Sequence, residues 1–234
     1  MTERLALVTG ASRGIGAATA EALAAAGYHV IITARTAKDL EAVEERIHAA
    51  GGSATIAPLD LVDGESIGRL AGAVAERWGK LDVLVLNAAT LGSLTPVPHI
   101  DPKEFARVLT LNVGAPAALI AAFDGALRQS DAPKVIGVTS SVGAKPRAYW
   151  GAYGASKAAF DTLLAAYAEE NETVGPIAVA IIDPGATRTK MRERAFPGED
   201  PQSVKPPAHV AARIVELVRS RWTSPLRGRV NDDF

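Results

Sequence analysis

The chain has 234 residues, of which 48% are hydrophobic, and this is enough length and apolar material for one substantial core. Its 25 lysines and arginines nearly balance its 26 aspartates and glutamates, which argues against the broad positive field that attracts nucleic acids or anionic membranes. Cysteine is absent and the four histidines are scattered without ligand spacing, so we expect no disulfide, no thiolate chemistry and no metal site.

The sequence gives no sign of membrane insertion or export. No segment approaches the roughly 18 apolar residues that a membrane-spanning helix needs. Residues 1–10, MTERLALVTG, carry charge at once and then a short apolar run, which is unlike a signal peptide. We therefore expect a soluble, cytoplasmic protein.

Short apolar, β-branched runs alternate with longer segments of helical periodicity along the whole chain. Strands are expected at 4–9, 29–34, 53–59, 81–87, 134–140 and 177–183, and helices at 14–26, 38–50, 64–78, 101–129, 151–171 and 207–220. Strands that are apolar throughout are typical of a sheet covered by helices on both faces. Repeated strand–helix units give parallel strands. The pattern predicts one three-layer α/β domain, 1–234, with a doubly wound parallel sheet.

A glycine-rich turn, TGASRGIG (9–16), lies directly between the first strand and the first helix. Gly10, Gly14 and Gly16 have the spacing of a tight turn that a pyrophosphate can approach, next to the positive end of a helix dipole. Because no GK[ST] sequence follows, the turn is not an NTP-binding P-loop. A turn without a ligand is the alternative, but its place in a doubly wound sheet favours dinucleotide binding.

The end of the second strand bears on which dinucleotide binds. An acidic residue there usually bonds the ribose 2′-hydroxyl and would repel a 2′-phosphate. Here Ala34 and Arg35 occupy that place, and no carboxylate precedes Asp39. Guanidiniums from Arg35 and Arg13 suit a phosphate dianion. The sequence thus favours NADP(H) over NAD(H), unless both arginines are solvated surface side chains.

Candidate chemical groups occur in YGASK (153–157) and at the end of the preceding strand. Tyr153 and Lys157 are four residues apart and project from one helix face. A free tyrosine has a pKa near 10, and a nearby cation with an oxidised nicotinamide would lower that pKa and favour a catalytic phenolate. Ser140 and Ser141 stand where a hydroxyl can bind a substrate carbonyl. A tyrosine–lysine pair alone is more typical of an ordinary helix surface, and the alternative for the two serines is a loop with local turn bonds.

Taken together, these segments resemble the short-chain dehydrogenase/reductase family, which has the Rossmann fold, over essentially the whole chain. TGASRGIG looks like the family's TGxxxGxG turn, and YGASK looks like its YxxxK pair. LNAAT (86–90) is similar to its NNAG segment, with Asn87 retained and Ala89 at the glycine position. LTLNVG (109–114) matches the segment with the family's asparagine, here Asn112, and DPGATRT (183–189) looks like its PGxxxT segment.

The resemblance implies a role for each catalytic residue. The family's serine lies thirteen residues before the tyrosine with a glycine three after it, and Ser140 meets both counts whereas Ser141 meets neither. Tyr153 would be the general acid in reduction and the base in oxidation. Lys157 would lower the pKa of Tyr153 and hold the nicotinamide ribose hydroxyls. Ser140 would orient the carbonyl or alcohol, and Asn112 would hold a water in a proton relay to Lys157.

The resemblance also implies a set of cofactor-binding residues. These are Gly10, Ser12, Arg13, Gly14, Ile15, Gly16, Arg35, Asp60, Leu61, Asn87, Tyr153, Lys157, Pro184, Gly185, Thr187 and Thr189. Asp60 looks like the family's adenine contact, although an aspartate after a strand can equally cap the following helix.

Residues 188–206 have no apolar periodicity and are expected to form a lid over the substrate. Their basic residues (Arg188, Lys190, Arg192 and Arg194) suit either an anionic substrate or a solvated loop. Tyr149, Trp150, Leu91 and Leu94 are candidates for the substrate pocket. The helices at 101–129 and 151–171 are where family members often form dimers or tetramers.

The sequence therefore predicts an NADP(H)-dependent oxidoreductase that acts on a small carbonyl compound or secondary alcohol. An NAD-linked alcohol dehydrogenase is one alternative. A non-catalytic dinucleotide-binding sensor on the same fold is another, but a sensor has no need of all four residues Asn112, Ser140, Tyr153 and Lys157.

Overall fold

A computed structural model describes residues 4–175 and 177–230, which form one parallel sheet between two layers of helices. The strand order is β3-β2-β1-β4-β5-β6-β7, and every neighbouring pair is parallel. The strands are β1 (Arg4–Thr9), β2 (Tyr28–Ala34), β3 (Ser53–Pro58), β4 (Val83–Leu86), β5 (Lys134–Val138), β6 (Ala178–Asp183) and β7 (Leu226–Arg229).

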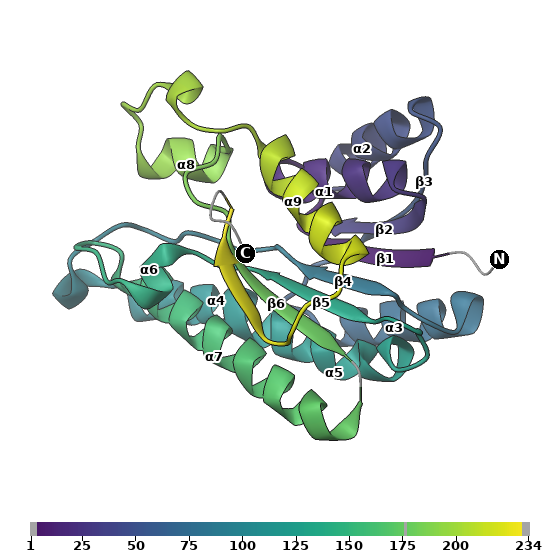
Figure 1. Cartoon of the computed structure of the whole chain (residues 1–234). Helices are drawn as coiled ribbons and strands as arrows, with labels where there is room; N and C mark the ends of the chain where they lie inside the picture. The colour runs from purple at the N-terminus through teal and green to yellow at the C-terminus, as the bar shows by residue number, and fades with distance from the viewer. Residues whose placement is uncertain (1–3, 176, 231–234) are drawn as a thin grey trace.

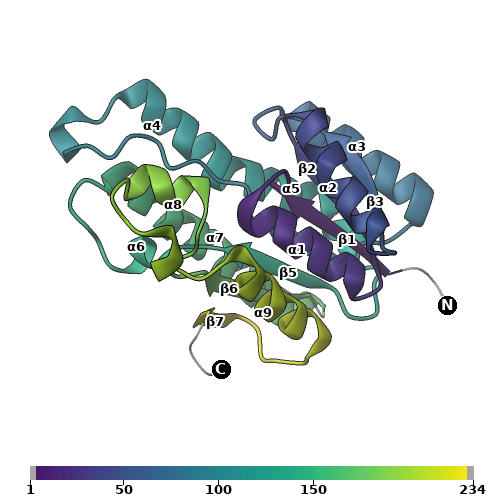
Figure 2. The ribbon, with the colours of Figure 1, turned by 90° about the horizontal axis from the view of Figure 1, so that it is seen from above.

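The helices lie on both faces of this sheet (Figure 1). They are α1 (Gly14–Ala25), α2 (Ala37–Ala49), α3 (Gly64–Trp78), α4 (Pro102–Leu109), α5 (Ala115–Leu127), α6 (Ser141–Ala144), α7 (Gly151–Val174), α8 (Lys190–Ala195) and α9 (Pro207–Arg219). Helices α1, α2 and α9 cover one face, and α3, α5 and α7 cover the other (Figures 1 and 2). The predicted doubly wound, three-layer α/β fold is confirmed.

The first strand shows why the strands are apolar throughout. Ala6 and Val8 point into the core beneath α1, α2 and α9. Leu5 and Leu7, which alternate with them, point into the core beneath α3, α5 and α7. Both faces of the strand are therefore buried, as expected for a parallel sheet with helices on each side.

The strand order reverses between β1 and β4, which are neighbours in the sheet although β2 and β3 lie between them in sequence. The chain leaves β1 toward one face of the sheet and β4 toward the other. A crevice opens at such a switch point, outside the carboxyl ends of the strands. This is where the glycine turn after β1 and the segment after β4 meet.

The helix predicted at 101–129 is present but contains a π turn, η2 (Thr110–Gly114), between α4 and α5. The whole run, Pro102–Leu127, has a mean hydropathy of 1.5 over its most apolar 18-residue window, so it is long and apolar enough to cross a membrane. The expectation that no segment approaches this limit is therefore wrong, because alanines make the run apolar without making it strongly hydrophobic. The core helix of a soluble protein passes the same test, and Leu119, Phe123 and Leu127 are buried against the sheet.

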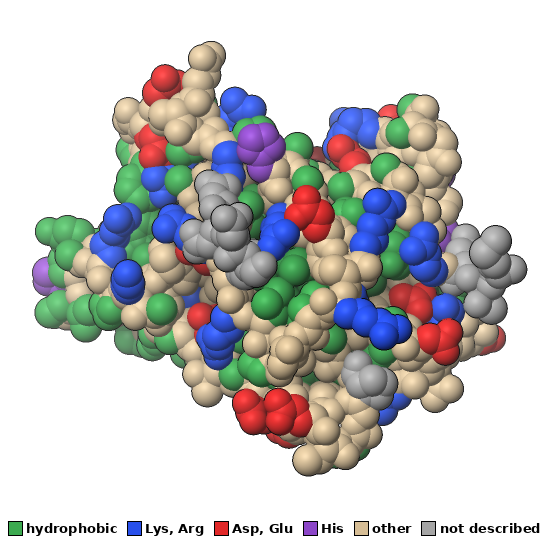
Figure 3. Space-filling view, viewed as in Figure 1, with side chains coloured by type: hydrophobic (Ala, Val, Ile, Leu, Met, Phe, Trp, Pro, Cys, Tyr) green, Lys and Arg blue, Asp and Glu red, His purple; other side chains and the backbone are tan. Residues whose placement is uncertain are grey.

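Several short elements were not expected from the sequence. β7 adds an edge strand beside β6, and α8 gives the expected lid a helical turn. Two 3-10 turns, η1 (Val97–His99) and η3 (Pro201–Ser203), lie in the long loops. Hydrophobic side chains gather at the projecting end formed by the loop around η1, where Val97 is 69% exposed (Figure 3). The same view shows acidic and basic side chains interspersed.

Candidate active site

A cavity of about 1000 Å³ lies at the carboxyl ends of the central strands. Its wall includes Gly10 after β1, Asn87 after β4, Ser140 after β5, and Asp183, the last residue of β6. Sixteen of the expected catalytic and cofactor-binding residues line it, namely Gly10, Ser12, Arg13, Gly14, Ile15, Arg35, Asp60, Leu61, Asn87, Ser140, Tyr153, Lys157, Pro184, Gly185, Thr187 and Thr189. Gly16, Asn112 and Ser141 are not part of the wall.

The glycine turn contains backbone conformations with positive φ angles, which residues other than glycine adopt only with strain. Gly10 and Gly14 have φ angles of +64° and +58°. Gly16 lies behind the turn, and a Cβ atom there would be only 2.2 Å from the carbonyl oxygen of Gly10. The three glycines therefore allow helix α1 to begin close against the end of β1, with its first N–H groups directed toward the cavity.

Asn87 and Thr9 fasten the end of β4 to the end of β1. The Asn87 Nδ2 group donates to the carbonyl oxygens of Thr9 (2.9 Å) and Gly10 (3.3 Å). The Thr9 hydroxyl donates to the Val85 carbonyl oxygen and accepts from the backbone N–H groups of Asn87 and Ala88. Asn87 thus holds the glycine turn in place while it also lines the cavity.

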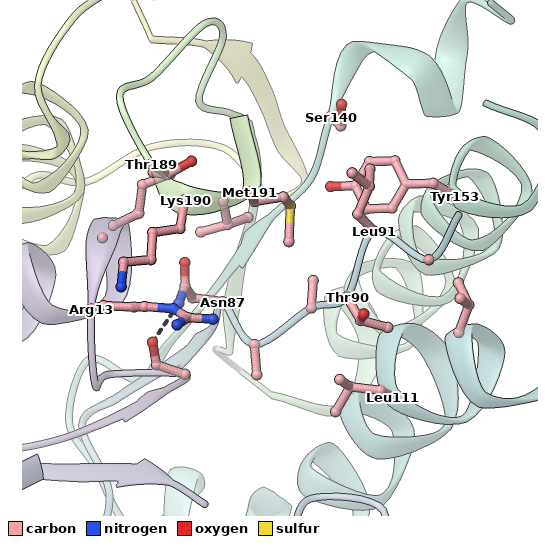
Figure 4. Close-up of a pocket in the computed structure, with 18 of the residues that line it drawn as sticks. Arg13, Asn87, Thr90, Leu91, Leu111, Ser140, Tyr153, Thr189, Lys190 and Met191 are labelled. Carbon is pink, nitrogen blue, oxygen red and sulfur yellow. Dashed lines mark hydrogen bonds between the residues drawn. The ribbon is translucent and has the colours of Figure 1, made fainter. Parts of the chain in front are cut away.

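The basic side chains expected at the cofactor site line one end of the cavity. Arg13 precedes the first turn of α1, and Arg35 follows β2; both are exposed. Within residues 4–175 and 177–230, no carboxylate forms an ion pair with either. Lys190 at the start of α8 lines the cavity too, and Figure 4 shows it with Arg13 and Asn87 at the side opposite Tyr153. Lys190 was expected only as part of the lid, since nothing in its spacing links it to the glycine turn.

Asp60 does not cap a helix. The residue that caps α3 is Asp63, whose Oδ1 accepts from the N–H of Glu65 at 3.1 Å. Asp60 Oδ1 instead accepts from the N–H of Val62 in a short turn, and its side chain stays exposed in the cavity wall. The capping alternative is therefore wrong, and the expected contact with an adenine stays a prediction.

Tyr153 and Lys157 project from α7 into the cavity wall and are 6% and 3% exposed. The Lys157 ammonium donates to the Val138 carbonyl oxygen at 2.8 Å and lies 5.9 Å from the centre of the Tyr153 ring. Burial lowers the pKa of the Lys157 ammonium to about 8, against the nearby carboxylate of Asp161, which raises it.

Within the protein alone, burial has the largest effect on the pKa of Tyr153. Burial raises the pKa of the phenol well above its usual range, and the carboxylates of Asp183 and Asp161 raise it further. The protein's own groups thus hold Tyr153 as a neutral phenol, while Lys157 directs its ammonium to the Val138 carbonyl. The expected lowering by Lys157 together with an oxidised nicotinamide stays a prediction.

Ser140 lies in the cavity wall, whereas the exposed Ser141 does not. In Figure 4 the hydroxyl of Tyr153 points into the space beneath Ser140, with Met191 of α8 beside it. Gly143 has a structural reason to be glycine, because a Cβ atom there would lie 3.0 Å from the backbone of Lys157 where α6 packs on α7. The geometry separates the two serines as the spacing predicts.

Asn112 is 1% exposed and binds protein groups from inside the π turn. Its Oδ1 accepts from the Thr90 N–H at 2.8 Å, and its Nδ2 donates to the Thr90 carbonyl and to the Ser156 hydroxyl, both at 2.9 Å. Ser156 in turn donates to the Tyr153 carbonyl oxygen. Asn112 therefore positions the segment after β4 and the first turns of α7. Its amide hydrogens are both engaged, so any water that it holds must use another atom.

Apolar and aromatic groups line the cavity around Tyr153. They are Leu91, Trp150 and Met191, the last from the segment 188–206 that was expected to form a lid. The Trp150 ring packs edge-on against Tyr153 at 6.0 Å and in a tilted arrangement against Phe196 at 5.7 Å. Two other predicted pocket residues are not in the wall: Tyr149 is 59% exposed, and Leu94 packs behind Leu91.

The basic lid residues do not act as one group. Arg192 pairs with Glu199 inside the lid, at 2.7 Å from its Nε, and stacks on Phe196 at 3.7 Å. Lys190, Arg192 and Arg194 line the cavity, whereas Arg188 is exposed outside it. No cluster of histidine, aspartate or glutamate within residues 4–175 and 177–230 is arranged to hold a metal ion.

The chain is similar over most of its length to known oxidoreductases. A family model described as "short chain dehydrogenase" matches residues 4–200. "Uncharacterized oxidoreductase YciK" of Escherichia coli (strain K12) is 37% identical over 213 residues, which cover 90% of this chain and 84% of that protein.

Solved structures agree in fold and in sequence. A short chain dehydrogenase from Shigella flexneri 2a strain 301, complexed with NADP, is 35% identical with a TM-score of 0.92, covering 99% of this chain and 98% of that chain. Another from Escherichia coli CFT073, complexed with NADPH, is 36% identical with a TM-score of 0.92 and the same coverage.

Proposed function

Because this chain belongs to the short-chain dehydrogenase family, we propose that it is an NADP(H)-dependent oxidoreductase acting on a carbonyl compound or secondary alcohol. The observation that carries this proposal is that Ser140, Tyr153 and Lys157 line the same cavity as the glycine turn. A protein that only senses a dinucleotide has no use for a buried acid beside a buried ammonium at that place. The substrate would be a small molecule, since the same cavity would also hold the dinucleotide.

The residues at the glycine turn fit the cofactor. Positive φ angles at Gly10 and Gly14, and the absence of a side chain at Gly16, leave room for a pyrophosphate at the start of α1. Arg13 and Arg35 lack carboxylate partners among the described residues and suit a 2′-phosphate. The NADP and NADPH complexes of similar proteins support the same preference. When bound, the nicotinamide would supply or accept the hydride.

In reduction, Tyr153 fits the role of the acid. A neutral Tyr153 phenol is a proton donor, and its raised pKa keeps it protonated at neutral pH. We assign it the transfer of a proton to the substrate oxygen, with the Ser140 hydroxyl donating a hydrogen bond to that oxygen. Lys157 holds a positive charge next to them and would bind the ribose hydroxyls. In oxidation, the same phenol would act as the base after losing its proton.

We propose a homodimer or homotetramer formed through α4, α5 and α7, since only 33% of the most apolar window in Pro102–Leu127 is buried within one chain.

The NAD-linked alternative has one observation in its favour, the carboxylate of Asp39, which lines the cavity near Arg35. Cofactor binding therefore has to be compared directly.

The cofactor assignment is tested by titrating NADPH and NADH by calorimetry. We expect NADPH to bind at least about tenfold more tightly, the equivalent of one charge-assisted bond or less. Arg35→Ala should reduce that difference, whereas Arg219→Ala, an exposed arginine on α9 outside the cavity, should not. Equal affinities for the two cofactors in the wild-type protein would overturn the NADP assignment.

The chemistry is tested with a panel of carbonyl compounds, followed by NADPH absorbance. Tyr153→Phe should lower turnover of any substrate found by about 10²–10⁴-fold, the usual contribution of a positioned acid, while NADPH affinity is retained. Full turnover in Tyr153→Phe would show that another group delivers the proton.

A further inference from the structure

Helix α7 carries a third ionisable residue in line with the two proposed catalytic ones. Tyr153, Lys157 and Asp161 are spaced four residues apart, so they share one face of the helix. Asp161 lies one turn beyond Lys157 and does not line the cavity. Asp161 has no role in the proposed reaction as described above.

One oxygen of the Asp161 carboxyl, Oδ1, is fully buried, and so is the hydroxyl of Thr139, which follows β5. The Thr139 hydroxyl interacts with the carboxyl and lowers its pKa, although neither buried atom has a partner at good hydrogen-bond geometry within residues 4–175 and 177–230. Burial has the larger effect and raises the pKa of Asp161. Burying an ionised carboxylate costs free energy unless a neighbouring positive charge compensates it, so Asp161 needs a nearby cation to stay ionised.

Two cations and one anion face Asp161 from the elements around it. Lys157 on α7 and Arg227 on β7 favour its ionised form, and the Asp183 carboxylate on β6 opposes it. Helix α6 and the π turn η2 also pack on α7, but neither contains an ionisable side chain. The ionisable residues of α4, which contacts α7 as well, are Lys103, Glu104 and Arg107, and these do not perturb the Asp161 carboxyl.

The electrostatic attraction between Asp161 and Lys157 also acts on Lys157, where it stabilises the charged ammonium. Lys157 is fully enclosed, and its described hydrogen bond is to a neutral group, the Val138 carbonyl. Desolvation lowers the pKa of its ammonium, and the Asp161 carboxylate is the charge that opposes this effect. Without that carboxylate, a larger fraction of Lys157 is neutral at physiological pH.

We propose that Asp161 is a positioning residue for Lys157, whose carboxylate keeps the buried ammonium charged so that it can act beside Tyr153. Asp161 touches neither the cavity nor a substrate, and it acts only through Lys157. The part of this role that concerns catalysis rests on the proposed function. The effect of the Asp161 carboxylate on the charge of Lys157 does not depend on that function, and it can be measured without a substrate.

The direct test is an NMR titration of the protein labelled with ¹³C at the lysine ε-carbon, with the Lys157 signal assigned by its loss in Lys157→Arg. We expect Asp161→Asn to lower the titration midpoint of Lys157 by at least about half a pH unit, the effect of removing one nearby opposite charge. Asp161→Glu should restore most of the shift. Glu169→Gln, an exposed acid further along the same helix, should leave the midpoint unchanged.

A second variant tests the inference independently of the fold of Asp161→Asn. Asp161→Ser also removes the carboxylate, so it should lower the Lys157 midpoint by about the same amount. Unchanged Lys157 midpoints in both Asp161→Asn and Asp161→Ser would overturn the inference.

The pH profile of kcat/KM for carbonyl reduction connects the charge to catalysis. Its descending limb should move to lower pH in Asp161→Asn by the same amount as the NMR midpoint. If the midpoint shifts but the wild-type protein reduces no carbonyl compound, the proposed function fails and the charge assignment stands. If the wild-type protein reduces a substrate but neither midpoint nor limb moves, the inference fails and the proposed function stands.

Discussion

Replacing Gly16 by alanine should separate the role of the glycine turn in cofactor binding from its role in packing. The added Cβ atom would lie 2.2 Å from the Gly10 carbonyl oxygen and 2.6 Å from Asn87 Nδ2. Real Cβ atoms essentially never come closer than 3.0 Å, so the turn must move by at least 3.0 − 2.2 = 0.8 Å. This movement affects the backbone that Asn87 fastens at 2.9 Å, and with it the N–H groups directed at a pyrophosphate.

The magnitude follows from that displacement. Overpacking of this kind costs about 1–3 kcal/mol in the free energy of unfolding, which for a chain of this size lowers Tm by about 2–12 °C. Loss of one hydrogen bond to a charged phosphate costs about 1.5–3 kcal/mol, so the Kd for NADPH should rise by roughly 10–100-fold. Calorimetry of NADPH binding and thermal unfolding measure the two effects separately.

Gly68→Ala is the matched control for Gly16→Ala. Gly68 is in the interior of α3, and a Cβ atom there meets nothing within 4 Å. Alanine should raise stability at that position by up to about 1 kcal/mol because it is a better helix former, with NADPH affinity unchanged. If Gly16→Ala bound NADPH as tightly as the wild-type protein does, the glycine turn would not be the pyrophosphate site.

Three further outcomes are expected. Ser140→Ala should lower turnover by about 10²–10³-fold, whereas its neighbour Ser141→Ala should have no effect on the same assay. Reduction should slow as pH rises through about 8, because the Lys157 ammonium, present below that pKa, loses its proton above it; kcat/KM against pH measures this. Lys134→Met removes three hydrogen bonds to carbonyls at the end of α9 and should cost about 1–3 kcal/mol in urea unfolding, whereas the exposed Lys38→Met should cost little.

The regular part of the fold was predictable because burial on both faces makes each inner strand apolar throughout. Runs such as 4–9 and 134–140 need no knowledge of their neighbours to be recognised. β7 escaped prediction because it is an edge strand with the sequence LRGR, in which only alternate residues are partly buried. Its position depends on pairing with β6, which is a long-range contact that local sequence does not contain.

The chemistry of the site was predictable only where spacing determines it. The thirteen-residue count from Ser140 to Tyr153, which the family resemblance implies, singles out the serine that lies in the cavity wall. The raised pKa of Tyr153 was not predictable, since it depends on burial and on Asp183 from another strand. Nor does the sequence show that Asp63, and not Asp60, caps α3, because both precede the helix.

Helix α9 packs beside α1, although most of the chain separates them in sequence (Figure 2). Val210, Ile214 and Leu217 of α9 complete the core on that face of the sheet, and Lys134 fixes the end of the helix from β5. While the protein is being synthesised, this apolar surface and the outer edge of β6 have no cover until residues 207–229 have left the ribosome. The strands and helices that precede residue 207 can therefore form before the C-terminal segment is available. Until α9 and β7 pack onto them, the exposed apolar surface makes the nascent chain susceptible to aggregation and proteolysis.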